Sequence, residues 1–143
     1  MKSKRIRSMF ALMMALGALL PACVSAPASN RPAPDQVTRD FYAWYLSYAE
    51  KANPLVDKAY RASDALSSEF VARLDEFTAG EMGFDPILCA QDAPASVTVA
   101  APAISGATAT VRVETSFAGH SFEVRLAQQA GAWKITEVVC AAQ

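Results

Sequence analysis

Hydrophobic residues in the first part of the chain repeat with helical spacing. Between residues 35 and 49 they form one broad apolar stripe, which is typical of an α-helix that packs on a core. The positions in this stripe are Val37, Phe41, Trp44, Tyr45 and Tyr48. Asp35 follows Pro34 and is the expected N-cap. Pro54 disfavours helical geometry at Asn53, so the helix is expected to end there.

Two more helical segments are predicted after this proline. A short one is expected at residues 55–62, and a longer one runs from Ser67, its expected N-cap, to about Ala79. The buried face of the longer helix would consist of Phe70, Val71, Leu74 and Phe77. Gly80 is expected to end this helix in the left-handed conformation. Residues 81–95 show no periodicity and separate the helical half from the rest.

The second half alternates between apolar and polar residues, as strands do. One strand face would carry Ala109, Val111, Val113, Thr115 and Phe117, and one face of the next strand His120, Phe122, Val124 and Leu126. Residues 96–101 and 132–139 supply the remaining strands, with Trp133 and Ile135 in the core. The predicted fold class is therefore α+β, with N-terminal helices packed on a curved antiparallel sheet of about four strands.

A tight turn at Ala118-Gly119 would pair the two central strands with Phe117 opposite His120. Both apolar sets then lie on the same sheet face, as a half-buried sheet requires. This register also sets Arg112 beside Arg125 and Glu114 beside Glu123. Like charges in direct opposition are unfavourable, so diagonal Arg–Glu pairs or a bulge would have to offset them.

The N-terminus has the order of a secretory signal. Lys2, Lys4, Arg5 and Arg7 precede an uncharged apolar run of 12 residues, 9–20. A membrane-spanning helix needs about 20 apolar residues, so this run is too short to be a membrane anchor. We expect residues 1–22 to be cleaved after directing export.

Two cleavage routes are open. Residues 20–23 end in Cys23 and resemble a lipobox, in which the cysteine thiol receives diacylglycerol. The alternative is cleavage after Ala26-Pro27-Ala28, which would release a soluble periplasmic or secreted protein beginning at Ser29. Residues 23–34 are rich in proline and suit a tether, which favours lipidation and membrane attachment. Residues 35–143 then form one domain.

Charge narrows the range of partners. The signal holds four of the 13 basic residues and none of the 14 acidic ones, so the mature chain has nine against 14 and a net charge of −5. Nucleic acids and anionic lipid surfaces both attract basic patches. The composition therefore argues against either as a partner.

Cysteine usage is consistent with export. With Cys23 lipidated, Cys89 and Cys140 are the remaining thiols, and two cysteines in an exported chain usually pair. By the loop-entropy model this disulfide would contribute about 4 kcal/mol. A reactive thiol pair has no support from a CxxC spacing or a neighbouring histidine.

Several segments together resemble a family of small exported bacterial proteins, known as domain of unknown function 3828. The resemblance extends roughly from Val37 to Cys140. It rests on residues 41–46, 53–61, 85–92 and 133–140. It implies a protein of the cell envelope with a fold like that of nuclear transport factor 2, in which a helix-backed curved sheet encloses a cone-shaped pocket. The resemblance implies no particular activity, and fold alone does not decide function.

Several polar residues are candidates for binding a ligand or a partner protein. The first helix and the segment after it carry more aromatic residues than one face is expected to bury, so Tyr42, Tyr45 and Tyr60 could aim hydroxyl groups into a cavity. Arg61 could meet an acidic ligand or pair with Asp57 or Asp64. The remaining candidates are Asp85, Gln91 and Asp92, in a loop next to Cys89.

Catalytic signatures are scarce. The sequence shows no glycine-rich phosphate loop, GxSxG, HExxH or Cys/His pair. Its single histidine, His120, is not accompanied by the clustered carboxylates that a zinc site would need. The favoured hypothesis is a non-enzymatic envelope lipoprotein that needs no cofactor and binds a protein or small ligand. Alternatives are a pocket hydrolase or isomerase using Asp85, Asp92 or His120, and an inhibitor or immunity protein that acts through a protruding loop within residues 81–95.

Overall fold

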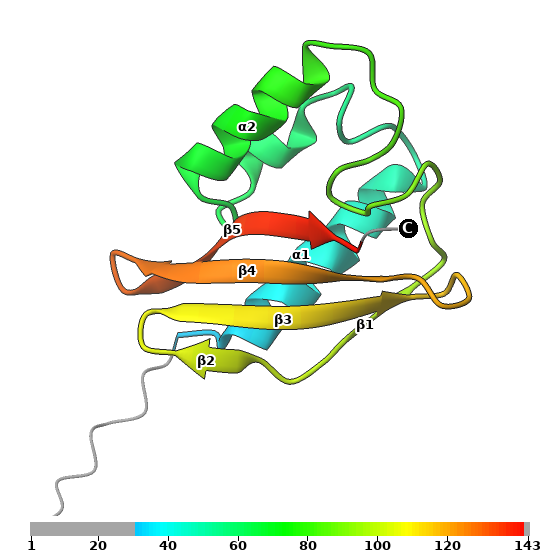
Figure 1. The fold of residues 1–143 in the computed structure, drawn as a ribbon. Helices are drawn as coiled ribbons and strands as arrows, with labels where there is room; N and C mark the ends of the chain where they lie inside the picture. The colour runs from blue at the N-terminus through cyan, green and yellow to red at the C-terminus, as the bar shows by residue number, and fades with distance from the viewer. Residues whose placement is uncertain (1–30, 142–143) are drawn as a thin grey trace, which may run out of the picture.

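The fold is a layer of helices against one antiparallel sheet, seen in a computed structural model that describes residues 31–141. The described elements are α1 (Pro34–Ala49), η1 (Ala59–Ala62), α2 (Ser68–Thr78), β1 (Val97–Val99), β2 (Ala103–Ser105), β3 (Thr108–Thr115), β4 (Ser121–Gln129) and β5 (Ala132–Cys140). In Figure 1, α1 crosses one face of the sheet and α2 lies beside β5. The export signal, Cys23 and nearly all of the predicted tether lie outside the described residues.

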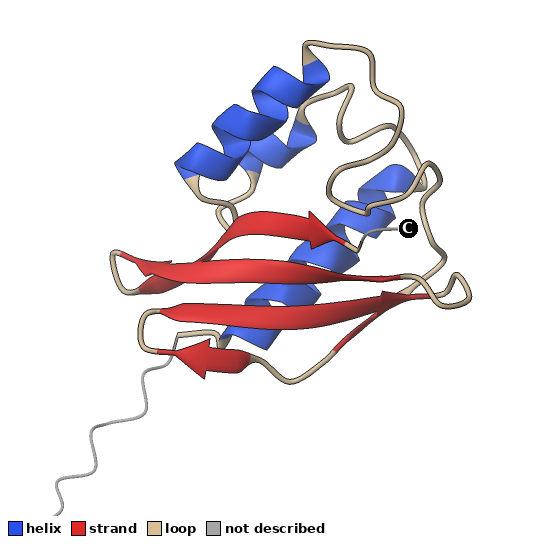
Figure 2. Cartoon of the chain, in the orientation of Figure 1, coloured by secondary structure: helices blue, strands red, loops and turns tan. Residues whose placement is uncertain are grey.

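The sheet has the order β1-β3-β4-β5, with β2 also paired to β3. β1 pairs with the end of β3 and β2 with its beginning, so the five strands fill four positions. Figure 2 shows α1 packed on one face of this open sheet. The expected α+β architecture is confirmed at this level, whereas a cone of the nuclear transport factor 2 type stays a prediction.

The core lies between α1 and the sheet and continues toward α2. From α1 it takes Phe41, Tyr42 and Tyr45, each at most 2% exposed. From the strands it takes Val111, Val113, Phe122, Val124, Leu126 and Ile135. These strand positions alternate with polar ones, so the two predicted strand faces are confirmed, although Phe117 is 38% exposed because it lies in the turn after β3.

Backbone pairing also covers part of the free edge of β5. The Ser67 amide donates to the Ile135 carbonyl at 2.9 Å, and the Ile135 amide donates to the Ala65 carbonyl at 2.7 Å. An uncovered edge is a site for unwanted strand pairing, and this contact removes it locally. It also fixes the start of α2 against β5. Within residues 31–141, no helix has the length and apolar character needed to cross a bilayer.

Helix ends differ from the sequence expectations in three places. α1 begins at Pro34 with Ala33 as N-cap, because proline suits the first helical position; Asp35 is not the cap but pairs with Arg39. The expected helix over residues 55–62 shortens to η1, because the Asn53 side chain accepts from the Leu55 and Val56 amides and holds a turn.

At the end of α2, Gly80 does not take the left-handed conformation. The helix ends instead at Thr78 with short i→i−3 contacts, in which the Ala79 and Gly80 amides donate to the Glu76 and Phe77 carbonyls. Tight turns of this kind satisfy terminal carbonyls without glycine geometry. At the other end, Ser67 caps the helix as predicted, and its hydroxyl oxygen accepts from the Phe70 amide at 3.1 Å.

The register between β3 and β4 differs by two residues from the tight-turn prediction. Arg112 lies opposite Glu123, and Thr110 lies opposite Arg125. Five residues, 116–120, connect the two strands, and Gly119 takes φ +73° in this turn. A shift of two preserves the faces of both strands and replaces like-charge neighbours with an opposite pair, which explains why this register is preferred.

Candidate functional site

A loop at residues 83–92, named here the clamped loop, lies beside the C-terminal ends of α1 and β5 and is fixed by its own hydrogen bonds. Asp85 Oδ1 accepts from the Ile87 amide at 2.7 Å and from the Leu88 amide at 3.1 Å. The Asp85 amide donates to the Ala90 carbonyl at 2.7 Å, closing the loop. Ile87 and Leu88 are buried at its centre. The loop therefore has a small core of its own.

Two tyrosines of α1 hold the clamped loop from beneath. The Tyr42 hydroxyl donates to the Ile87 carbonyl at 2.9 Å, and the Tyr45 hydroxyl donates to Asp85 Oδ2 at 2.7 Å. Burial raises the pKa of both phenols, with a further increase from the charge of Asp85, so both stay protonated donors. Burial also raises the pKa of the Asp85 carboxyl, although its three hydrogen bonds act in the opposite direction.

His120 and the disulfide hold the other end of the clamped loop. His120 Nε2 lies 2.9 Å from the Cys89 carbonyl oxygen, and Nδ1 lies 3.0 Å from Thr115 Oγ1. Because a carbonyl only accepts, Nε2 carries the proton. Cys89 is bonded to Cys140 at the end of β5, as expected from the cysteine count. Both ring nitrogens of His120 are thus engaged in structural hydrogen bonds.

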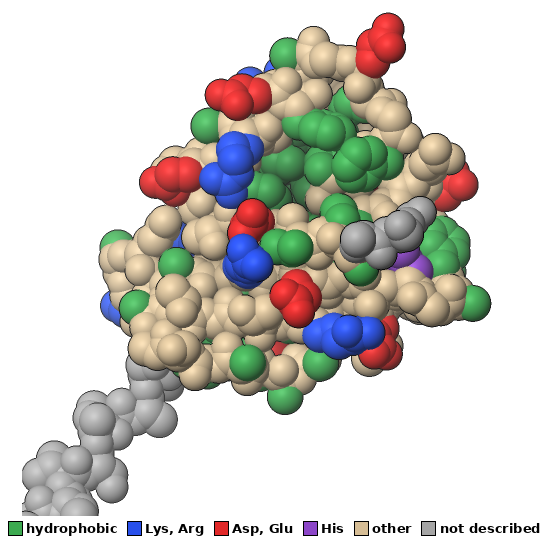
Figure 3. Space-filling model, in the orientation of Figure 1, with side chains coloured by type: hydrophobic (Ala, Val, Ile, Leu, Met, Phe, Trp, Pro, Cys, Tyr) green, Lys and Arg blue, Asp and Glu red, His purple; other side chains and the backbone are tan. Residues whose placement is uncertain are grey.

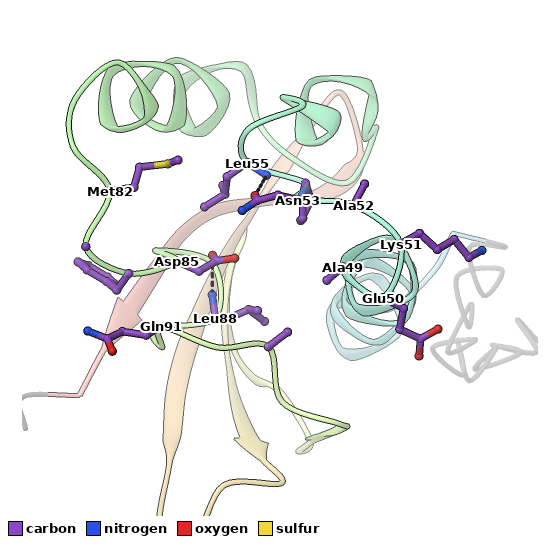
Figure 4. Close-up of a pocket in the computed structure, with 14 residues that line it drawn as sticks. Ala49, Glu50, Lys51, Ala52, Asn53, Leu55, Met82, Asp85, Leu88 and Gln91 are labelled. Atoms are coloured by element: carbon purple, nitrogen blue, oxygen red, sulfur yellow. Dashed lines mark hydrogen bonds between the residues drawn. The ribbon is translucent and has the colours of Figure 1, made fainter.

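Two hollows flank the clamped loop. The first, the helix-end hollow, has a volume of about 510 Å³ and lies between the loop and the end of α1. Its lining includes Ala49, Glu50, Lys51, Leu55, Met82, Phe84, Asp85, Leu88 and Gln91. Figure 4 shows this hollow with the loop on one side and the C-terminal end of α1 on the other.

The second hollow, the hairpin groove, has a volume of about 900 Å³ and lies between the clamped loop and the β3–β4 turn. Its lining includes Phe84, Cys89, Gln91, Asp92, Phe117, His120 and Cys140. Phe84 and Gln91 line both hollows, so the part of the loop that carries them forms a ridge between two depressions.

Apolar side chains are exposed on this ridge and around it. Phe84 is 43% exposed, Phe117 38% and Met82 37%. The Phe84 ring meets Phe77 of α2 edge-on, with ring centroids 5.5 Å apart, so its position is supported from the side. Figure 3 shows hydrophobic side chains gathered over the region between α2 and the sheet. Exposed aromatic residues on a rigid support are typical of protein-binding surfaces.

The remaining predicted site residues lie elsewhere or play other parts. Tyr60 is fully buried, and its hydroxyl donates to Asp75 Oδ1 at 2.7 Å. Arg61 pairs with the same Asp75 oxygen at 2.8 Å, not with Asp57 or Asp64, because α2 brings Asp75 closer in space than the sequence neighbours. The hydrogen bond from Arg61 lowers the pKa of Asp75. This cluster is separate from the clamped loop.

Of the seven predicted binding residues, the fold brings five to the clamped loop. Tyr42 and Tyr45 are buried beneath it, so they act on the loop and line neither hollow. Direct ligand contact by their hydroxyls stays a prediction. Asp85 lines the helix-end hollow, Asp92 the hairpin groove, and Gln91 both.

Sequence reasoning missed Phe84, Met82 and Phe117 as surface residues. Met82 and Phe84 flank Gly83 within a segment without periodicity, where no strand or helix face is available to bury them. Large apolar residues in such a segment are the signal that could have marked this surface.

Two solved structures share this fold, both of the type VI effector–immunity complex Tae3–Tai3 from Ralstonia pickettii. In the native complex the matched chain has a TM-score of 0.63 and 22% sequence identity, covering 78% of this chain and 97% of that chain. The selenomethionine form has a TM-score of 0.61 and 22% identity, with coverage of 78% and 98%. This chain therefore shares its fold with the matched chain of that effector–immunity complex. At this identity the likeness shows the fold alone.

Neither the protein-family models nor the curated proteins contain a match to this chain. The resemblance to the family of unknown function therefore stays a prediction.

Proposed function

We propose that this protein is an exported immunity-type protein, which binds an effector protein and neutralises it without catalysis. Its fold resembles that of Tai3, which occurs in a complex with the effector Tae3. The observation that carries the proposal is the ridge of the clamped loop, where Phe84 is 43% exposed on a loop fixed by α1, His120 and a disulfide. A surface ordered before binding loses little conformational entropy when it meets its partner.

A non-catalytic role agrees with the state of the polar side chains. Both ring nitrogens of His120 have structural partners, Nε2 in the clamped loop and Nδ1 at Thr115, the last residue of β3. A general acid or base needs a proton that it can exchange with a substrate. We therefore do not propose the hydrolase or isomerase alternative.

The predicted export signal gives the proposed binding a location. Attachment through Cys23 would hold the domain at the envelope, which is the proposed place of effector action, and α1 begins at Pro34, the last residue of the predicted tether. Retention of the immunity protein at that site would raise its local concentration.

The test is binding of the purified exported protein to type VI effectors of its host, measured by calorimetry. Phe84→Ala is expected to weaken binding by about 2 kcal/mol, or roughly 30-fold in Kd, as for the central aromatic residue of an interface. Ile104→Ala is the matched control, because Ile104 is 56% exposed on β2, which pairs with the opposite end of β3 from the hairpin groove. Equal effects of the two variants, or no effector binding, would contradict the proposal.

A further inference from the structure

Asp85 lines the helix-end hollow and has no basic ion-pair partner among residues 31–141. The ion pairs in this part of the chain are Arg39–Asp35, Arg61–Asp75, Arg112–Glu114 and Arg125–Glu137. Lys51 lines the same hollow, but Figure 4 shows its side chain directed away from Asp85. The hydrogen-bond donors to this carboxyl group are therefore all uncharged: the Tyr45 hydroxyl and two backbone amides.

The geometry leaves the Asp85 carboxylate one unused acceptor position, on a side chain that lines the helix-end hollow. Oδ1 accepts from two backbone amides, whereas Oδ2 accepts only the Tyr45 hydroxyl. Each carboxylate oxygen offers about two lone-pair sites, so Oδ2 has one to spare. In Figure 4 the carboxylate points from the clamped loop into the space facing α1.

The rest of the helix-end hollow adds negative potential above an apolar floor. The C-terminal end of a 16-residue helix lies on one side, where aligned peptide dipoles give a partial negative charge. Leu55 and Leu88 are at most 4% exposed and form the floor. Met82 and Phe84 supply exposed apolar surface at the rim. An acidic end with apolar walls matches a side chain that has an aliphatic stem and a cationic head.

We propose that the helix-end hollow receives a lysine or arginine side chain of the partner protein, with the cationic group on Asp85 Oδ2 and the stem against Met82 and Phe84. This inference rests on the proposed function. It specifies that the partner protein presents a basic side chain to this acidic domain. The net charge of −5 in residues 31–141, which hold nine basic and 14 acidic residues, favours approach of such a partner.

A peptide titration tests the hollow without knowledge of the effector. The ¹⁵N-labelled mature protein, as a bacterial host exports it, is titrated with acetyl-Gly-Lys-Gly-amide, its arginine counterpart and acetyl-Gly-norleucine-Gly-amide. Norleucine keeps the aliphatic stem and lacks the ammonium group. Saturable amide shifts are expected at residues 49–51 and 82–85 with the lysine or arginine peptide, and not with norleucine. Equal shifts with norleucine, or none with any peptide, would overturn the inference.

Asp85→Asn removes the charge and keeps an acceptor oxygen for the Ile87 and Leu88 amides. It is expected to weaken binding of the basic peptide by about tenfold or more, because a charged hydrogen bond is lost. Asp92→Asn is the control, since Asp92 lines only the hairpin groove, and its affinity should stay within about twofold of wild type. Equal affinities of wild type and Asp85→Asn for the basic peptide would contradict the assignment. The norleucine comparison uses the wild-type protein, so it tests the inference even where the variant does not fold.

The effector measurement separates this inference from the function on which it rests. If the lysine peptide binds and no effector does, the hollow stands and the immunity role fails. If an effector binds wild type and Asp85→Asn equally, the immunity role stands and the basic side chain does not enter this hollow.

Discussion

Asp85 illustrates how one residue combines a local and a tertiary interaction. Within the loop, Asp85 accepts hydrogen bonds from two backbone amides, as the turn preference of aspartate predicts from the sequence. The Tyr45 hydroxyl reaches it from 40 residues away in sequence. The fold also buries Asp85, and this burial raises the pKa of its carboxyl. No local sequence pattern predicts that shift.

The raised pKa of Asp85 gives a pH-dependent stability with a definite sign. The folded protein holds this proton more tightly than the unfolded chain, whose aspartate has an ordinary pKa of 3.8. Stability from this group is thus fully present below 3.8 and is lost as the pH rises through the folded pKa. The melting temperature of wild type relative to Asp85→Asn should rise as the pH falls from 7 toward 3.8. Thermal unfolding of both proteins across this range measures it, and a difference independent of pH would refute it.

At the scale of elements, the clamped loop is a rigid unit although it contains neither helix nor strand. Tyr42 and Tyr45 of α1 and His120, the residue before β4, form hydrogen bonds to it, and the disulfide joins it to β5. Irregular backbone is usually the more mobile part of a fold. Here side-chain contacts replace the missing backbone ladder, so the loop can present Phe84 in one position.

Removal of the disulfide should release this loop before the sheet. Cys89 and Cys140 are 51 residues apart, and by the loop-entropy model their bond contributes about 4 kcal/mol to the free energy of unfolding. Cys89→Ala with Cys140→Ala should lower the denaturation midpoint accordingly. Hydrogen exchange followed by mass spectrometry should show faster exchange at residues 83–92 than in β3 and β4, relative to wild type. A uniform increase over the whole domain would contradict the loop-specific role.

The register of the β3–β4 hairpin could not be determined from the alternating sequence pattern alone. Alternation specifies which side chains share a face, and this was confirmed for Val111, Val113 and Val124. It cannot distinguish registers that differ by two, since both place the same residues inside. The predicted clash of Arg112 with Arg125 was a warning against the tight turn, and the observed pairing of Arg112 with Glu123 resolves it.

For the whole molecule, the predicted lipid attachment at Cys23 would decide where the domain acts. Expression in a bacterial host should yield a membrane-bound protein with a diacylglycerol-sized mass increment on the wild type, absent from Cys23→Ser. Intact mass with membrane fractionation measures both. An unmodified soluble chain beginning at Ser29 would instead indicate release, and a diffusible or secreted target would then replace the envelope effector.

The sequence by itself determined the helical first half, the alternating strands, the Ser67 cap and the pairing of two cysteines, because periodicity, capping and cysteine count are local or compositional properties. The sequence also marked the loop within residues 81–95 and three of its polar side chains, but only the tertiary structure decided how the candidate site is assembled. The sequence suggested Tyr42 and Tyr45 as hydroxyls that face a cavity, whereas in the fold they are buried donors to loop residues 45 and 40 positions away in sequence. Such contacts depend on how α1 crosses the sheet. The exposure of Phe84 likewise depends on which surfaces the packed elements leave uncovered.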